Sequence, residues 1–286
     1  MSEAALCPTD SRILGTLKVN RSEIRGFTLG VLTTLVGGGQ VDVNFNEFSE
    51  NDVALLLLDT NTNTTVTGNV FRFNSGVNSL LDRGYGIALN TIAADAPAQN
   101  RTVIHSNQFV DDSAQDISIA IEAFIDANAT RTAHSMVISS NIFTLQAPEA
   151  IGMLITDVDK GVLIDNGFRG SALTALFLDS FSFDQPVSGW SVLENRFNSV
   201  GIDADIFFGF GVTDSLIGPQ LASVFAPSPG SSGNTYLHSV PRGLGTSARA
   251  TKPVGPLVHR THRTESAFAA LVERFGPRRR PAKESQ

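Results

Sequence analysis

Cysteine, tryptophan and tyrosine are scarce in this 286-residue chain. Cys7 is the single cysteine, which excludes an intramolecular disulfide and a zinc site built from several cysteines. Trp190, Tyr85 and Tyr236 stand against 19 phenylalanines. Phenylalanine suits a dry interior stack, whereas a wet sugar-binding platform favours the polar-tipped rings of tyrosine and tryptophan. The aromatic composition therefore lowers the expectation of a sugar-processing groove.

Long apolar runs and a basic leader are also lacking. No apolar run approaches the ~20 residues that span a bilayer, so no transmembrane segment is expected. Residues 1–10 show no basic region followed by a long apolar one, so no secretory signal is expected either. Hydrophobic residues make up 42% of the chain and charged residues 17%, which argues against global disorder.

Positive charge is sparse until the end of the chain. From residue 237 onward there are ten Lys/Arg and three Asp/Glu, a net charge of +7. The preceding residues hold 11 Lys/Arg and 25 Asp/Glu, a net charge of −14. We expect an acidic body and a basic C-terminal tail, which contacts an anionic partner or the acidic body itself.

A repeated Asn-x-Phe sequence is the clearest feature that the chain does contain. It occurs six times, each time with an aliphatic residue three positions before the Asn, whereas chance would give about one Asn-x-Phe pair. The pairs are Asn46/Phe48, Asn69/Phe71, Asn107/Phe109, Asn141/Phe143, Asn166/Phe168 and Asn195/Phe197. Self-similarity at this spacing is typical of a solenoid.

Each repeat offers two β-prone runs, one that ends near the Asn and one that follows the Phe, and none contains a convincing amphipathic helix. The Asn-to-Asn spacing varies while the runs recur, as expected when insertions bulge from the corners of a coil. The pattern predicts an all-β, right-handed parallel β-helix of about seven to eight coils. The aliphatic and Phe residues would form internal ladders, and the Asn would lie at a bend.

In these columns the chain resembles the parallel β-helix repeat proteins of the pectate-lyase-like superfamily. The resemblance covers roughly 17–218, with a degenerate first coil at 17–27 that has Gly26 near the Asn position and a degenerate last coil at 212–218. It implies an extracellular or cell-surface location. A leucine-rich repeat is the structural alternative, although the aliphatic that it requires five residues before the Asn is present in one of the six repeats, at Val41.

The composition divides the chain into four parts. Residues 1–16 are an N-terminal extension or cap, 17–218 the β-helix, and 219–262 a linker or cap covering with one more strand at Tyr236. Residues 263–286 hold a short amphipathic helix and the basic tail, in which Thr264 or Ser266 caps the helix. The apolar face of this helix comprises Phe268, Leu271, Val272 and Phe275.

Polar side chains end the second run of several repeats and are the first candidates for a site. The column comprises Asp59, Asn90, Asp126, Asp157 and Asp179. If they stack, neighbouring side chains lie ~5 Å apart, where carboxylates repel and their pKa values rise. A glycosidase needs two acids at such separations. A lyase would use Ca²⁺ on the carboxylates and a base such as Arg169.

Two observations weaken an enzymatic interpretation. Asp and Asn are common where strands end, so the column is also explained by turn formation. Asp111-Asp112 is similar to the paired Asp of pectin-hydrolysing enzymes, but their Asn-Thr-Asp, Gly-His-Gly and Arg-Ile-Lys motifs are absent, and so are pectate-lyase and epimerase motifs. We therefore expect this doublet to form a solvated turn.

The sequence favours a non-catalytic β-helix module that presents an acidic flank to a polysaccharide or protein partner. Its substrate-binding candidates are the five residues of the column. The alternative is a polysaccharide lyase or glycoside hydrolase, with Asp126, Asp157, Asp179 and Arg169 as catalytic candidates. No cofactor is predicted for the module, and Ca²⁺ belongs to the lyase alternative.

Overall fold

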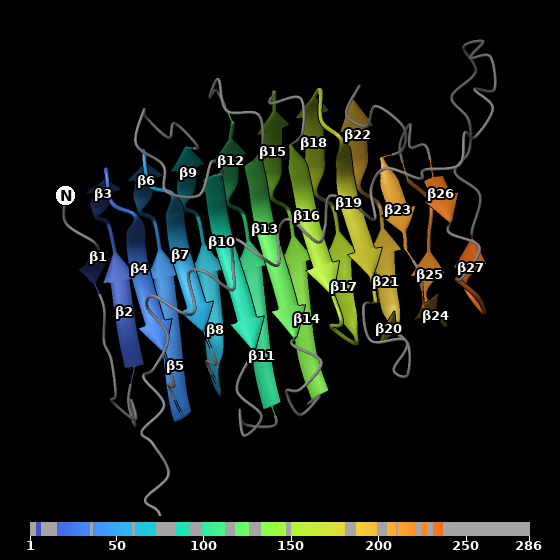
Figure 1. The fold of residues 1–286 in the computed structure, drawn as a ribbon, viewed down its shortest axis with the longest axis horizontal. Helices are drawn as coiled ribbons and strands as arrows, with labels where there is room; N and C mark the ends of the chain where they lie inside the picture. Colours follow the sequence, from blue (N-terminus) through green and yellow to red (C-terminus); the bar gives the residue numbers. More distant parts are fainter. Residues whose placement is uncertain are drawn as a thin grey trace, which may run out of the picture.

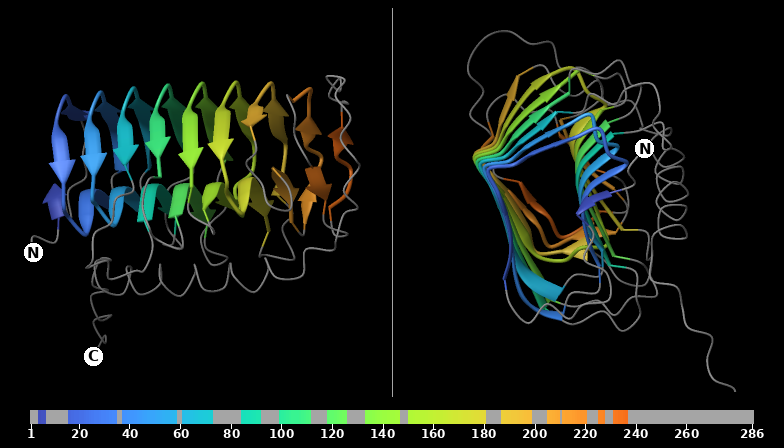
Figure 2. Two further views of the ribbon diagram at one scale, coloured as in Figure 1. Left: turned by 90° about the horizontal axis from the view of Figure 1, so that it is seen from above. Right: turned by 90° about the vertical axis from the view of Figure 1, so that its left-hand side faces the viewer.

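The chain folds into a right-handed parallel β-helix (Figures 1 and 2). The computed structural model describes residues 4–6, 16–34, 37–58, 61–72, 84–91, 99–111, 118–125, 133–146, 150–180, 187–198, 205–209, 211–220, 225–227 and 231–236. Within these ranges all regular elements are β-strands, and neighbouring strands pair in parallel. The predicted fold class is confirmed.

Three long sheets form the sides of the coil, and the chain visits them in the order B, C, A. Sheet A comprises β1 (Ala4–Leu6), β4 (Leu29–Thr34), β7 (Val53–Leu58), β10 (Gly84–Thr91), β13 (Ser118–Ile125), β16 (Ile151–Thr156), β19 (Thr174–Asp179), β23 (Ile206–Phe208) and β26 (Phe225–Pro227). Sheet B comprises β2 (Thr16–Asn20), β5 (Gly37–Asn44), β8 (Asn61–Thr67), β11 (Gln99–His105), β14 (Ala133–Ser139), β17 (Gly161–Ile164), β21 (Trp190–Leu193), β25 (Leu216–Ile217) and β27 (Thr235–Tyr236). Sheet C comprises β3 (Glu23–Arg25), β6 (Glu47–Ser49), β9 (Val70–Arg72), β12 (Gln108–Val110), β15 (Ile142–Leu145), β18 (Gly167–Gly170) and β22 (Arg196–Asn198). A small separate pair joins β20 (Val187–Ser188) to β24 (Val212–Thr213).

The structure refines the sequence prediction in three places. Each coil has three strands and not two, because the Asn-x-Phe segment itself forms the short strand of sheet C. The sheets also continue past 17–218, since β1, β26 and β27 pair with them, and β27 is the extra strand expected at Tyr236. The predicted helix and tail at 263–286 lie outside the described residues.

The recurring Phe forms a stack through the interior. Phe48, Phe71, Phe109, Phe143, Phe168 and Phe197 lie in register on sheet C, with neighbouring ring centroids 4.5 to 5.1 Å apart and nearly parallel planes. Identical residues one coil apart have the inter-strand spacing, which is also a good stacking distance. The predicted Phe ladder is confirmed.

The recurring Asn forms a buried ladder at the corner between sheets B and C. The Asn107 side-chain carbonyl accepts hydrogen bonds from the Asn69 backbone N–H and amide group, both at 2.9 Å, and the Asn107 amide donates to the Val66 carbonyl at 2.8 Å. The same pattern repeats from Asn46 to Asn195. Each Asn thus satisfies backbone groups that a tight bend would leave unpaired.

Ser22 and Gln220 end this ladder. The Ser22 N–H donates to the side-chain Oδ1 of Asn46, and the Asn195 N–H donates to Oε1 of Gln220. The sequence prediction placed Gly26 near the Asn position of the first coil, and the structure gives that position to Ser22. Gly26 lies four residues later, with a φ of +76° after the strand of sheet C.

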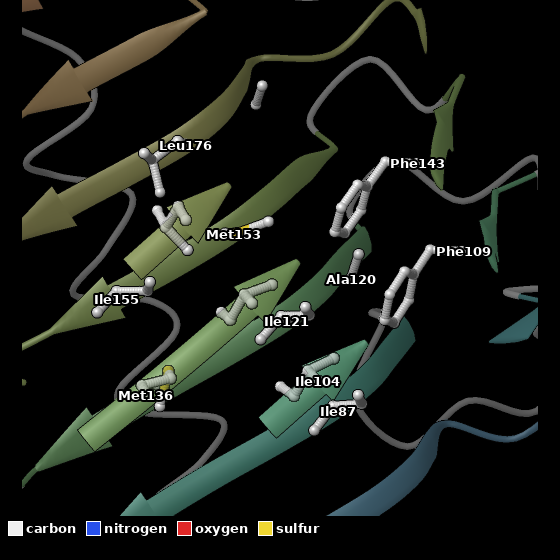
Figure 3. Close-up of a cluster of buried hydrophobic side chains, with 14 of the residues drawn as sticks. Ile87, Ile104, Phe109, Ala120, Ile121, Met136, Phe143, Met153, Ile155 and Leu176 are labelled. Carbon is white, nitrogen blue, oxygen red and sulfur yellow. The ribbon is translucent and has the colours of Figure 1, made fainter. Parts of the chain in front are cut away.

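Aliphatic side chains of sheets A and B fill the rest of the interior. Figure 3 shows Ile87, Ile121 and Met153 of sheet A facing Ile104 and Met136 of sheet B, beside the stacked Phe109 and Phe143. All are buried, so the interior is a dry apolar column closed by the three sheets.

Sheet A is also apolar on its outward side, where a second buried cluster lies. Its members are Leu29, Leu32, Val53, Leu56, Leu58, Tyr85, Ala88, Ile119, Ile151, Leu154, Phe177 and Phe207. These residues give sheet A the continuous hydrophobic runs typical of strands buried on both faces.

Candidate functional site

The predicted polar column does not form a single row. Thr156 of β16 pairs with Asp179 of β19, so Asp157 lies one residue beyond the row that holds Asp179. Asn90 pairs with Phe124, and Phe124 with Thr156, which places Asn90 in the same row as Asp179 but three strands away. The expected alignment was wrong by one residue, because unequal insertions hid the register. Asp59 and Asp126 lie outside the described residues.

Asp157 and Asp179 are held within the turn that follows sheet A. The Asp157 side chain is 1% exposed and Oδ1 accepts a hydrogen bond from the Ser180 hydroxyl at 3.0 Å, while the Asp157 N–H donates to the Asp179 carbonyl. Asp157 adopts a φ of +57°, in the left-handed region that Asp tolerates better than most residues. The arrangement is that of a turn.

Asp179 is fitted closely to the next coil. Its Oδ1 accepts a hydrogen bond from the Ser180 N–H at 2.9 Å, and the residue is 5% exposed. A Cβ at Gly209 would lie 2.2 Å from the same oxygen, so the absence of a side chain there makes room for the carboxylate. A carboxylate enclosed in this way cannot meet a polymer chain.

Asn90 has an acidic neighbour that the sequence did not indicate. Its amide donates to Oε2 of Glu122 at 3.4 Å, and both side chains are buried at the outward side of sheet A. Glu122 lies in the row of Ala88 and Leu154, within the second apolar cluster.

Arg169 lies on a different side of the coil from these acids. It is an exposed residue of β18 in sheet C, and its Nε donates to Oγ1 of Thr144 at 2.7 Å. Asp179 ends the next strand of sheet A, after residues Thr174–Asp179, which in extended form span about 17 Å. The structure therefore separates the predicted base from the predicted acids.

The expected solvated turn at Asp111 is also corrected. Asp111 is fully buried, and its Oδ2 accepts hydrogen bonds from the Ser118 hydroxyl at 2.9 Å and the Gln146 N–H at 3.3 Å. Asp111 thus connects the end of β12 to the first residue of β13 and to the end of β15 through these hydrogen bonds. Asp112 lies outside the described residues. In the part of the chain that the structure describes, no three His, Cys, Asp or Glu side chains are grouped to hold a metal ion.

An open hollow on the outward side of sheet C has the composition of a binding site. It has a volume of about 460 Å³ and is lined by Ser140, Asn141, Ile142, Asp165, Gly167, Phe168, Arg169, Arg196, Phe197 and Asn198. Ile142, Gly167 and Arg196 are paired neighbours on β15, β18 and β22. A Cβ at Gly167 would meet nothing within 4 Å, so the hollow exists because Gly stands between two longer side chains.

Arginine gives this hollow a positive character. Arg169 and Arg196 are both exposed, and Nη2 of Arg196 lies 3.6 Å from Oδ1 of Asp165, which is itself half exposed. At the other end of sheet C the exposed arginines are paired with Glu: Arg25 with Glu50, and Arg72 with Glu47 at 3.2 Å. One sheet therefore carries neutralised charge at its N-terminal end and a net positive hollow at its C-terminal end.

The sequence contained a signal for this hollow. The variable residue of each Asn-x-Phe lies between a buried Asn and a buried Phe, so it points outward. In order these residues are Glu47, Val70, Gln108, Ile142, Gly167 and Arg196. Reading this row, and not only the conserved letters of the repeat, would have located the hollow.

The acidity of the body is much weaker on the described surface than in the sequence. Half of the 14 described carboxylates are buried: Asp42, Asp52, Asp111, Glu122, Asp157, Asp179 and Asp205. The other seven described carboxylates are not buried, and the same ranges hold eight Lys and Arg, none of which is buried. Within the described ranges the exposed carboxylates are therefore matched in number by exposed Lys and Arg, and the other 11 Asp and Glu that precede residue 237 lie outside these ranges.

Comparison with protein-family models, with curated protein sequences and with solved structures found no match for the chain. Within the described ranges, no helix has the length and hydrophobicity needed to cross a membrane.

Proposed function

We propose that this protein is a non-catalytic β-helix module, and that the hollow on sheet C binds an acidic polysaccharide. The observation that supports the proposal is that the candidate catalytic carboxylates are buried, whereas the surface that a ligand can reach is a different one. The candidate acids that the structure describes, Asp157 and Asp179, are enclosed in turns, whereas the accessible hollow carries two arginines and a single carboxylate, Asp165, which lies beside Arg196. Fold alone does not decide between enzyme and binding module, so the argument rests on this site.

The composition of the hollow fits a carboxylated sugar chain. Arginine binds carboxylates through paired N–H donors, and Asn198 adds an amide at the same edge. Ile142 is 45% exposed and offers an apolar surface to the face of a sugar ring. The hollow extends across successive strands of sheet C, which are about 4.8 Å apart, so it is open to an elongated ligand.

The buried aromatic residues support binding of modest strength. Trp190 and Tyr85, which would make strong sugar platforms, are inside the structure. Binding must then depend on charge, which makes it sensitive to salt.

The test is binding of polygalacturonate by the full-length protein, measured by titration calorimetry at low and high salt. We expect the double variant Arg169→Ala/Arg196→Ala to weaken binding at least tenfold. Gly167→Leu, which fills the hollow, should do the same without removing charge. The matched control is Arg72→Ala, which removes an arginine from the same sheet outside the hollow and should leave affinity within about twofold.

Three results would overturn the proposal. One is binding unaffected by both changes in the hollow, and another is binding of a protein partner in place of the polysaccharide. The third is progressive shortening of the polymer that Asp157→Ala or Asp179→Ala abolishes, since that would assign the enzymatic alternative.

A further inference from the structure

The outward face of sheet A has the composition and burial of a protein core. Its central row consists of Leu32, Leu56, Ala88, Glu122, Leu154, Phe177 and Phe207, paired strand by strand. Every member is buried, and Phe177 stacks on Phe207 with centroids 4.9 Å apart. No described strand lies over this face, which looks away from the coil axis (Figure 2).

The equivalent outward row of sheet B shows how much solvent exposure such residues keep when no further layer covers them. Thr65, Val103, Val137 and Val162 have the same strand spacing and the same neighbours above and below, and all are half-buried. Stacking alone therefore does not bury an outward row. Sheet A must be covered by part of the chain outside the described ranges.

The short connections beside the middle of sheet A are poor covers. Segments 92–98, 112–117, 126–132 and 147–149 contain two large apolar residues in all, Ile92 and Ile117, whereas 73–83 before β10 contains four and 181–186 after β19 contains two. An apolar row of this length needs apolar partners. Most of the connections beside the row do not supply them, and the C-terminal segment holds four more large apolar residues.

We propose that the C-terminal segment 263–276 packs on the outward face of sheet A of its own chain. A helix from Thr264 to Phe275 would be about 18 Å long and would cross about four strands. It would present Phe268, Leu271, Val272 and Phe275 as one apolar stripe. The apolar stripe of segment 263–276 therefore suits the apolar outward face of sheet A.

Chain length permits this contact. Tyr236, the last described residue, ends β27 at the C-terminal end of the coil. Twenty-seven residues connect it to Thr264 and reach up to about 90 Å when extended, whereas nine strands of sheet A span about 38 Å. The segment can reach any strand of the face.

Charge also favours the contact. The insertions at both ends of the sheet A strands carry Asp82, Asp95, Asp112, Asp116, Asp126, Glu149, Asp184 and Asp203, against Arg83 and Arg131. Within 263–276, Arg263 and Arg274 are balanced by Glu265 and Glu273, and the segment is followed by Arg278, Arg279 and Arg280. An amphipathic segment with a basic sequence directly after it is thus matched to an apolar face with acidic connections at its edges.

Two substitutions in the full-length chain test the proposal. Leu271→Asp places a carboxylate in the apolar stripe, and Ala270→Asp places the same group on the opposite side of the helix. We expect Leu271→Asp to raise the fluorescence of an apolar dye several-fold while the strand circular dichroism is retained, and Ala270→Asp to leave both unchanged. No rise with Leu271→Asp, or an equal rise with both, would overturn the proposal.

A paramagnetic label identifies the surface that the segment contacts. The label is placed at Ala270→Cys in a Cys7→Ser background, and methyl signals are recorded. We expect broadening of Leu56 or Leu154 methyls and none at Val103 and Val137. Broadening confined to Leu216 and Ile217 would mean that the segment caps the last coil. Broadening that requires a labelled second molecule would mean docking between copies, and either result contradicts the proposal.

Discussion

The outward faces of sheets A and B differ although both sheets are built from nine parallel strands in the same coils. The central outward row of sheet A is mostly Leu and Phe and is buried, whereas that of sheet B runs through Lys18, Thr65, Val137 and Ser191 and is largely half-buried or exposed. The inward rows of the two sheets are alike, since both are aliphatic. The comparison shows that the inside of the coil is generic and that its outside distinguishes one face from another.

A second hydrophobic layer has consequences for stability. A coil with a single core loses little when an outward residue is changed, because such residues contact mainly their neighbours on the same sheet. If sheet A is buried on both sides, its outward residues should behave like core residues. Each prediction below compares the two faces on this point.

The largest difference is expected for a buried charge. Leu154→Asp on sheet A should reduce the free energy of unfolding by about 4 kcal/mol or more, because the carboxylate would be desolvated without a partner. Val137→Asp on sheet B should cost about 1 kcal/mol. Urea unfolding measures both. If Leu154→Asp does not fold, Leu154→Ala and Val137→Ala replace the pair, and equal small losses would remove the distinction between the faces.

The next difference concerns aromatic stacking on the two sides of the wall. Phe177→Ala on the outward face should cost about 3–5 kcal/mol, as much as Phe143→Ala in the interior stack, because both rings are buried and stacked. Chemical unfolding of the two variants measures this directly. A loss below about 1 kcal/mol for Phe177→Ala would show that the outward cluster is not a core.

The smallest effect is expected for a solvent-accessible ion pair on the outer surface. On sheet C, the Arg25 guanidinium donates to Glu50 and lowers the pKa of that carboxyl group. A lowered folded-state pKa adds stability above the unfolded pKa, and this stability is lost as pH falls through the folded pKa. Glu50→Gln should therefore be slightly destabilising at neutral pH and neutral in acid, with the difference reduced by salt. A large loss that persists in acid would contradict this assignment.

The repeated chemistry of the fold could be predicted from the sequence. Asn107 and Phe109 serve the same purpose in their coil as Asn141 and Phe143 in the next, so the columns were visible as a recurring pattern and their buried positions followed from it. The third strand was missed because it is short and is the repeat itself. Ser22 was missed because it replaces Asn at the end of the ladder, where a single bond is needed.

The candidate site could not be predicted in the same way. Asp157 and Asp179 end similar runs, but a one-residue offset in register places them in different rows, and no sequence pattern shows this offset. The hollow on sheet C depends on the absence of a side chain at Gly167 between Ile142 and Arg196. Both features arise from contacts between coils 23 or more residues apart, so the register needs the structure, and the hollow becomes visible in the sequence only when the middle residues of successive repeats are compared.

Solvent access to methyl groups on the two faces tests the central comparison most directly. A soluble paramagnetic probe should broaden the methyl signals of Val103, Val137 and Val162 on sheet B, and it should leave those of Leu32, Leu56 and Leu154 on sheet A sharp. Equal broadening on both faces would contradict the account, because the outward side of sheet A would then be a surface and not a second core.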